Sequence, residues 1–162
     1  MYMFYNSMLH VRKSPFACAR IKGSSSYPDI AGMAWFYKMQ AGILVSINLR
    51  GLPEPDADCQ SPIFAVHIHG GGSCTGDETD PFMNAMTHYN PDACAHPYHA
   101  GDLPPLFGAN GIAFSAFLTN RFSADEIIGK TMIVHAGLDD FTTQPSGNAG
   151  KKMACGVVRC VQ

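Results

Sequence analysis

Histidines gather in one stretch of this chain, and their number and spacing point to metal binding. Five of the seven histidines lie between Phe64 and Asp102, and a sixth follows the later apolar run TMIV. Imidazole is the side chain that binds metal ions most often. The stretch reads FAVHIHGGGSCTGDETDPFMNAMTHYNPDACAHPYHAGD and predicts a metal site; the candidate ligands are His67, His69, His88, His96, His99, Asp102 and His135.

The number of candidate ligands permits two ions. Six histidines and one aspartate make seven side chains, whereas two four-coordinate ions need eight bonds in total. One imidazole that binds an ion through each of its nitrogens would supply the missing bond. An all-imidazole site suits copper, and three histidines with one aspartate suit a tetrahedral zinc. The arithmetic allows such a bridged pair without proving it.

The first two histidines lie on a predicted strand. Phe64, Val66 and Ile68 alternate with a second set of positions that includes His67 and His69. Successive side chains of a strand point to opposite faces. We therefore expect the apolar set to enter the core and both histidines to stand side by side on the other face.

The remainder of the chain reads as short strands separated by turns, which is typical of an all-β sandwich or barrel. The predicted strands cover residues 17–22, 30–39, 43–52, 111–119, 130–135 and 153–161. Residues 70–111 show little periodicity, so metal ligation would have to order them. The length of 162 residues suits one domain, which we place at 16–162 after an N-terminal extension at 1–15.

Composition excludes several classes of protein. The formal net charge is −2 with an ordinary charged fraction, so nothing suggests a nucleic-acid partner, and the apolar runs are too short to span a bilayer. The N-terminus, MYMFYNSMLHVRKSPF, lacks a basic start followed by an unbroken apolar run. We expect a cytoplasmic protein, or an extracytoplasmic one if a signal peptide had been removed. His10 in this segment is interpreted as an ordinary surface or packing histidine.

The motifs around these residues resemble the copper–zinc superoxide dismutase family. They are HIH, HYNP, HAGDL and VH, followed by the C-terminal GNAGKKMACGVV, in the family's order and over roughly residues 17–162. Together they are highly specific, although HIH alone would be weak. The resemblance implies an immunoglobulin-like, eight-stranded Greek-key barrel with long metal-binding loops. It also implies that the protein disproportionates superoxide anion to oxygen and hydrogen peroxide.

The resemblance implies a role for each candidate residue. The implied copper ligands are His67, His69, His88 and His135. The implied zinc ligands are His88, His96, His99 and Asp102. His88 would be the bridge, and during turnover it would release copper, take up a proton and return it. Asp139 would link ligands of both metals.

The six cysteines are many for a cytoplasmic protein. The resemblance implies a disulfide between Cys74 and Cys155. We interpret the other four as unpaired thiols or small core residues: Cys18, Cys59, Cys94 and Cys160. A metal contact by Cys94, which lies among the implied ligands, is a minor alternative.

Lys152 is the clearest departure from the family pattern, which normally has an arginine at this position. Lysine keeps the positive charge that guides the anion but loses the planar fork of donors. Lys151 beside it would add to the field. We interpret the chain as a bacterial-type variant with lysine at this position. Two further departures from the family are the close spacing of His96 and His99 and a loop at 139–151 that is short and poor in charge.

Two other functions remain open from the sequence. One is a copper- and zinc-binding or copper-buffering module with little or no turnover. The other is a zinc-stabilised structural sandwich with an empty copper site, against which the complete set of copper ligands argues. The family often forms dimers through different surfaces, so a homodimer is expected without a defined interface.

Overall fold

The structure is a computed structural model that describes residues 14–55 and 62–161. In these ranges nine strands form one antiparallel sheet in the order β4-β6-β7-β3-β2-β1-β9-β8-β5. The strands are β1 Ala17–Gly23, β2 Ala31–Met39, β3 Gly42–Arg50, β4 Ile63–Phe64, β5 Val66–His69, β6 Leu106–Ala109, β7 Ile112–Thr119, β8 Thr131–His135 and β9 Lys152–Cys160. The helical segments are η1 Met83–Ala85 and α2 Ala124–Ile127. Most of the predicted extension at 1–15, with His10, and also Cys59 lie outside the described residues.

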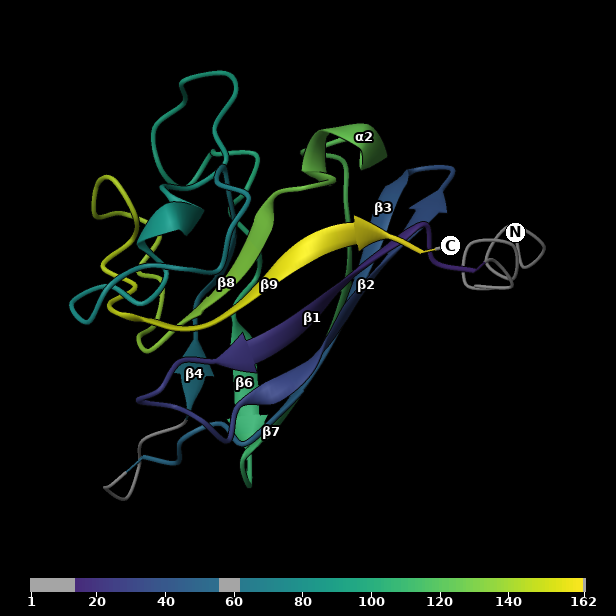
Figure 1. Ribbon diagram of the computed structural model, residues 1–162. Coiled ribbons are helices and arrows are strands. Elements are labelled where there is room, and N and C mark those ends of the chain that lie inside the picture. Colours follow the sequence, from purple (N-terminus) through teal and green to yellow (C-terminus); the bar gives the residue numbers. More distant parts are fainter. Residues whose placement is uncertain (1–13, 56–61, 162) are drawn as a thin grey trace.

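The sheet curls into a barrel because its first and last strands are consecutive in the chain (Figure 1). Only Ala65 separates β4, which pairs with β6, from β5, which pairs with β8. The Ala65 N–H donates to the Gly137 carbonyl over 2.8 Å, and its carbonyl accepts from the His135 N–H over 2.9 Å. The predicted all-β barrel is confirmed; nine strands replace the expected eight because the strand at 63–69 is divided at Ala65.

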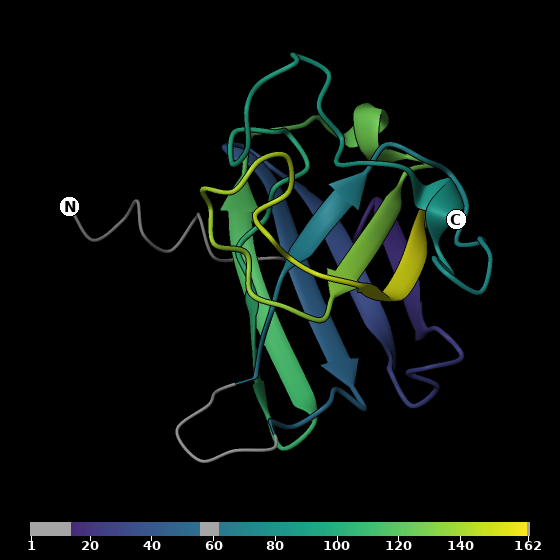
Figure 2. The ribbon, with the colours of Figure 1, turned by 90° about the vertical axis from the view of Figure 1, so that its left-hand side faces the viewer.

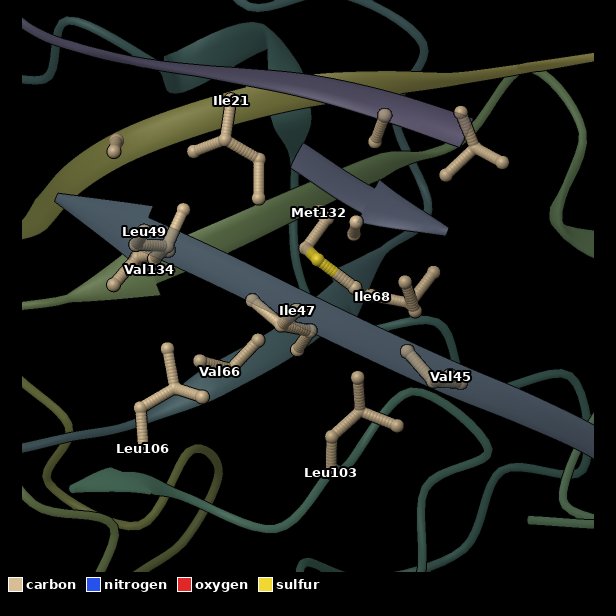
Figure 3. Close-up of a cluster of buried hydrophobic side chains, with 14 of the residues drawn as sticks. Ile21, Val45, Ile47, Leu49, Val66, Ile68, Leu103, Leu106, Met132 and Val134 are labelled. Carbon is tan, nitrogen blue, oxygen red and sulfur yellow. The ribbon is translucent and has the colours of Figure 1, made fainter. Parts of the chain in front are cut away.

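Alternating apolar residues of the strands fill the barrel (Figure 3). Val45, Ile47 and Leu49 of β3 are fully buried, as their alternation predicts. They meet Val66 and Ile68 of β5 inside the same cluster. Burying each such side chain contributes roughly 1.5–3 kcal/mol, so the inner face of β5 is firmly anchored beneath its histidines.

Strand β7 alternates as predicted; three of its larger apolar side chains face outward, whereas Phe117 packs against the core. Ile112, Phe114 and Leu118 are each at least 50 % exposed, whereas Ala113 is buried. On the neighbouring β6, Phe107 is 65 % exposed. The outer side of β6 and β7 therefore carries an apolar patch.

Two long segments, 70–105 and 136–151, gather on one side of the barrel (Figures 1 and 2). The predicted disulfide between Cys74 and Cys155 is confirmed and ties the first segment to β9. Cys18, Cys94 and Cys160 are free thiols. No helix within 14–55 and 62–161 is both long and apolar enough to cross a membrane.

Candidate metal centre

Strand β5 organises the candidate site because loop segments run along it. The Tyr89 N–H donates to the Ile68 carbonyl, and the Ile68 N–H donates to the Gly101 carbonyl, each over 2.8 Å. These bonds set His88 opposite His69, and Asp102 opposite His67. Residues far apart in the sequence thus reach the two histidines of β5, which are covered by the loops rather than exposed.

Four imidazoles converge at one point. His67, His69, His88 and His135 each offer one nitrogen, and these four atoms lie within 4.8 Å of one another. The Nδ1 of His67 and the Nε2 of His88 are buried without a hydrogen-bond partner. Buried polar atoms are rarely left unpaired, so an ion bound by these nitrogens would satisfy them. The donor set fits copper.

The other nitrogens of three of these rings are occupied. His67 Nε2 donates to Asp139 Oδ2 over 2.8 Å, and His69 Nδ1 donates to the Met86 carbonyl over 2.8 Å. His135 Nδ1 donates to the Gly150 carbonyl over 3.1 Å. Such contacts fix the tautomer and orientation of a metal-binding histidine. Each ring therefore turns an unprotonated nitrogen toward the shared point.

A second cluster consists of His88, His96, His99 and Asp102, whose ligand atoms also lie within 4.8 Å of one another. Asp102 Oδ1 is 2.7 Å from His88 Nδ1 and 3.3 Å from His99 Nδ1, and Asp102 Oδ2 is 3.1 Å from His96 Nδ1. Three nitrogens and one carboxylate suit tetrahedral zinc. His88 belongs to both clusters, with Nδ1 in this one and Nε2 free toward the other.

Asp139 links the two clusters through hydrogen bonds to one histidine of each. Its Oδ2 accepts from His67, and its Oδ1 accepts from His96 Nε2 over 2.9 Å. The carboxylate is almost fully buried. Gly147, at φ +67°, closes over it, and a Cβ there would lie 2.0 Å from Asp139 Oδ1. Only glycine fits this position without displacing the carboxylate.

Burial and neighbouring charges keep the imidazoles of His67, His69 and His135 neutral. Burial lowers the pKa of His67 and of His69 to about 2 and that of His135 to about 4, with further lowering by neighbouring histidines. Burial alone would raise the pKa of Asp102, but the hydrogen bond from His88 and nearby imidazole charge lower it below its ordinary value. Neutral imidazoles and an ionised carboxylate are the forms that bind metal ions.

The metal-free protein should therefore lose stability in mild acid. The unfolded histidines take up protons near pH 6.5, whereas folded His67, His69 and His135 do not until lower pH. We expect the free energy of unfolding to fall by about 2–4 kcal/mol between pH 7 and pH 5.5, measured by urea unfolding without metals. The His135→Gln variant should show a decline about one third smaller, because it lacks one of three such groups. An unchanged free energy would contradict the buried, neutral state of these rings.

Two residues that the sequence did not single out hold the second cluster in place. The guanidinium of Arg121 donates to the carbonyls of Pro97, His99 and Asp102 over 2.8, 3.2 and 3.3 Å. The Gln144 side chain accepts from the His96 N–H over 3.0 Å and donates to the His96 carbonyl over 2.7 Å. Both contacts join separate loops, so no local spacing marks them.

Lys152 lies beside the four-imidazole cluster, opposite His135 in the pairing of β8 with β9. Its amine donates to Asp80 Oδ2 over 2.6 Å and to the Phe82 carbonyl over 3.1 Å. Its charge contributes, after burial, to the lowered pKa of His135. Lys151 is exposed, and the exposed Cys94 belongs to neither cluster of the described residues.

Comparisons with known proteins agree on one family. The sequence profile described as copper/zinc superoxide dismutase matches residues 30–158. Superoxide dismutase [Cu-Zn] 2 of Aquifex aeolicus is 31 % identical over 146 residues, which cover 81 % of this chain and 80 % of that protein. Superoxide dismutase [Cu-Zn] of Photobacterium leiognathi is 35 % identical over 64 % of this chain and 68 % of its own length. The solved structure of Cu/Zn superoxide dismutase from Brucella abortus has the same fold, with a TM-score of 0.71 and 22 % identity over 87 % of this chain and 98 % of that one.

Proposed function

The chain belongs to the copper/zinc superoxide dismutase family, and we propose which of its residues carry the reaction. It is a superoxide dismutase with copper and zinc as cofactors. In our proposal copper is held by His67, His69, His88 and His135. Zinc is held by His88, His96, His99 and Asp102.

The position of His88 is the observation that carries this proposal. Its Nε2 is buried and unpaired, while its Nδ1 is 2.7 Å from Asp102 in the second cluster. One ring thus offers a nitrogen to each ligand set, which accounts for eight bonds from seven side chains. The two donor sets match the preferences of copper and of zinc respectively.

Copper held by these residues would supply a one-electron couple, which would accept an electron from one superoxide and return it to a second. His88 would hold a proton from solvent at Nε2 while that nitrogen does not bind the ion, and would deliver it to the peroxide, whose second proton would come from solvent. Asp102 keeps Nδ1 of the same ring directed toward the second cluster. Asp139 orients His67 and His96 together, so it couples the positions of the two ligand sets.

Lys152 attracts and places the superoxide anion in this proposal, and a substitution series tests it. Positive charge near the reaction centre raises the encounter rate with an anion, and salt screens the effect. The expected order of dismutation rates is Arg ≥ Lys > Ala > Glu at position 152, with a salt dependence that weakens or inverts in the Lys152→Glu variant. The rates are measured at low and physiological ionic strength with copper content checked. Equal rates for all four at low salt would show that Lys152 is only a surface residue.

The same assay separates dismutation from metal storage. A module that binds copper and zinc with little turnover would retain both metals yet consume no superoxide at any salt concentration. The Lys152 series would then have no rate to modulate. A metal analysis paired with each rate measurement therefore distinguishes the two functions.

Assembly and location complete the proposal. A homodimer is supported by the outward-facing patch of Phe107, Ile112, Phe114 and Leu118, because contiguous exposed apolar surface is typical of association sites. Sedimentation velocity tests the homodimer, and a monomer at high protein concentration would contradict it.

We also propose domain limits of 16–162, which limited proteolysis tests. We propose a cytoplasmic location, which cell fractionation tests.

A further inference from the structure

A carboxylate binds the amine that is proposed to receive the anion. The Nζ of Lys152 lies 2.6 Å from Asp80 Oδ2, with the two side chains 15 % and 37 % exposed. The Phe82 carbonyl accepts a second hydrogen bond from the same amine. A lysine ammonium has three donors, so these contacts leave one N–H for another ligand.

Asp80 is held in place by the backbone around it. Its Oδ1 accepts from the Phe82 N–H over 3.0 Å, which directs Oδ2 toward the amine. The Asp80 N–H donates to Asp77 Oδ1 over 2.9 Å, and the Asp80 carbonyl accepts from the Met83 N–H over 3.1 Å. The loop therefore presents the carboxylate in a fixed orientation, and the long lysine side chain reaches to it.

The segment 74–86, which we call the disulfide loop, is anchored along its length. Cys74 is bonded to Cys155 in β9, and Phe82 and Ala85 pack against Cys155 and Ile133 in a small buried cluster. At its end the Met86 carbonyl accepts from His69 Nδ1. The disulfide loop thus orients a proposed copper ligand and restrains the amine of Lys152.

The surroundings of the pair are acidic on the loop side. Asp77, Glu78 and Asp80 line a cavity of about 330 Å³ together with Lys151 and Lys152. Charges that line a hollow of the surface set the local concentration of an approaching ion. Of these carboxylates, Asp80 contacts the amine directly, so it opposes the attraction that Lys152 exerts on an anion more than the others do.

We propose that Asp80 is a positioning residue for anion recognition, which holds the amine of Lys152 against the disulfide loop and offsets part of its charge. This inference rests on the proposed role of Lys152. An anion that approaches the four-imidazole cluster meets the amine of Lys152, which has one free N–H donor, and the carboxylate of Asp80, which competes for that amine. Asp80 therefore limits how tightly small anions bind, which favours rapid release over retention.

Azide binding to the copper- and zinc-loaded protein, followed by optical titration, tests the inference without measuring turnover. The Asp80→Asn variant removes the charge and keeps an oxygen for the Phe82 N–H. We expect it to bind azide about 3–10-fold more tightly than the parent protein, with a steeper salt dependence. The Asp80→Glu variant keeps the charge, so its azide affinity should stay within about twofold of that of the parent protein. A gain in affinity in this variant as well would show that disruption of the loop, rather than loss of charge, causes the effect.

Glu78→Gln is the matched control, because Glu78 is exposed and lines the same cavity, whereas the ion pair of Lys152 is with Asp80. It should change azide affinity by less than about twofold. In a Lys152→Met background, Asp80→Asn should also change it by less than about twofold, because the residue acts through the amine. An equal gain in both backgrounds would show general repulsion and overturn the positioning role.

The experiment distinguishes failure of the role proposed for Asp80 from failure of the role proposed for Lys152. If Lys152→Met weakens azide binding but Asp80→Asn leaves it unchanged, the role of Asp80 is wrong and that of Lys152 stands. If Lys152→Met leaves azide affinity and its salt dependence unchanged, the proposed role of Lys152 is wrong, and that of Asp80 falls with it. Thermal unfolding and metal content of each variant establish that it is folded and loaded.

Discussion

Replacing His135 with alanine is expected to abolish superoxide dismutation and remove copper while zinc remains bound. The His135 Nε2 lies 3.3 Å from His69 Nε2 in the four-imidazole cluster, and His135 takes no part in the second cluster. Loss of an outer-shell partner alone costs about 10–100-fold in metal affinity, so loss of a direct ligand should cost more. Metal analysis after dialysis, paired with a superoxide-consumption assay, measures both effects.

His99→Ala is the matched control for this substitution. His99 belongs only to the second cluster, where its Nδ1 lies 3.3 Å from Asp102. This variant should lose zinc and keep copper when copper is supplied. If His135→Ala retained full dismutation, the assignment of copper to the four imidazoles would be wrong.

Removing the disulfide by the Cys155→Ser substitution should cause a large loss of stability. The bond joins residues 81 positions apart, and closing a loop of that length contributes about 4–5 kcal/mol in the chain-entropy model. Cys155→Ser would also place a hydroxyl in the small apolar cluster of Phe82, Ala85 and Ile133. Urea unfolding of the metal-free protein, with and without reductant, measures the change in the free energy of unfolding.

Cys18→Ser provides the comparison, because Cys18 is a free, partly exposed thiol on β1. The Cys18→Ser substitution should change the free energy of unfolding by no more than about 0.5 kcal/mol, as most surface substitutions do. Equal stabilities of the Cys155→Ser and Cys18→Ser variants would show that the bond contributes little.

The Cys155→Ser variant should also bind azide differently, since the disulfide loop holds Asp80 and orients His69.

The strands were predictable because burial imposes a period on the sequence. The alternation of Val45, Ile47 and Leu49 marks β3, and that of Val66 and Ile68 marks β5. Alternation defines two faces but does not say which one is inner. On β7, Ile112, Phe114 and Leu118 face outward, whereas Ala113 and Phe117 face inward, which the pattern alone did not decide.

The two clusters were predictable because metal ligands are few in kind and the family motifs order them. The contacts that support them were not, since they connect loops without any period. The Arg121 guanidinium donates to three backbone carbonyls between residues 97 and 102, and the Gln144 side chain bonds to the backbone of His96. Asp80 is one of several acidic residues in its segment, and only the folded chain brings it to Lys152.

The way loop segments run along β5 has a consequence for association between chains. A strand at the border of a sheet presents unpaired backbone groups that can template pairing with another molecule. One side of β5 is paired with β8, and on the other side Ile68 bonds to the backbone of Tyr89 and Gly101. The segments that carry His88 and Asp102 thereby also shield this strand from intermolecular β-pairing, so the metal-binding loops protect the fold against aggregation.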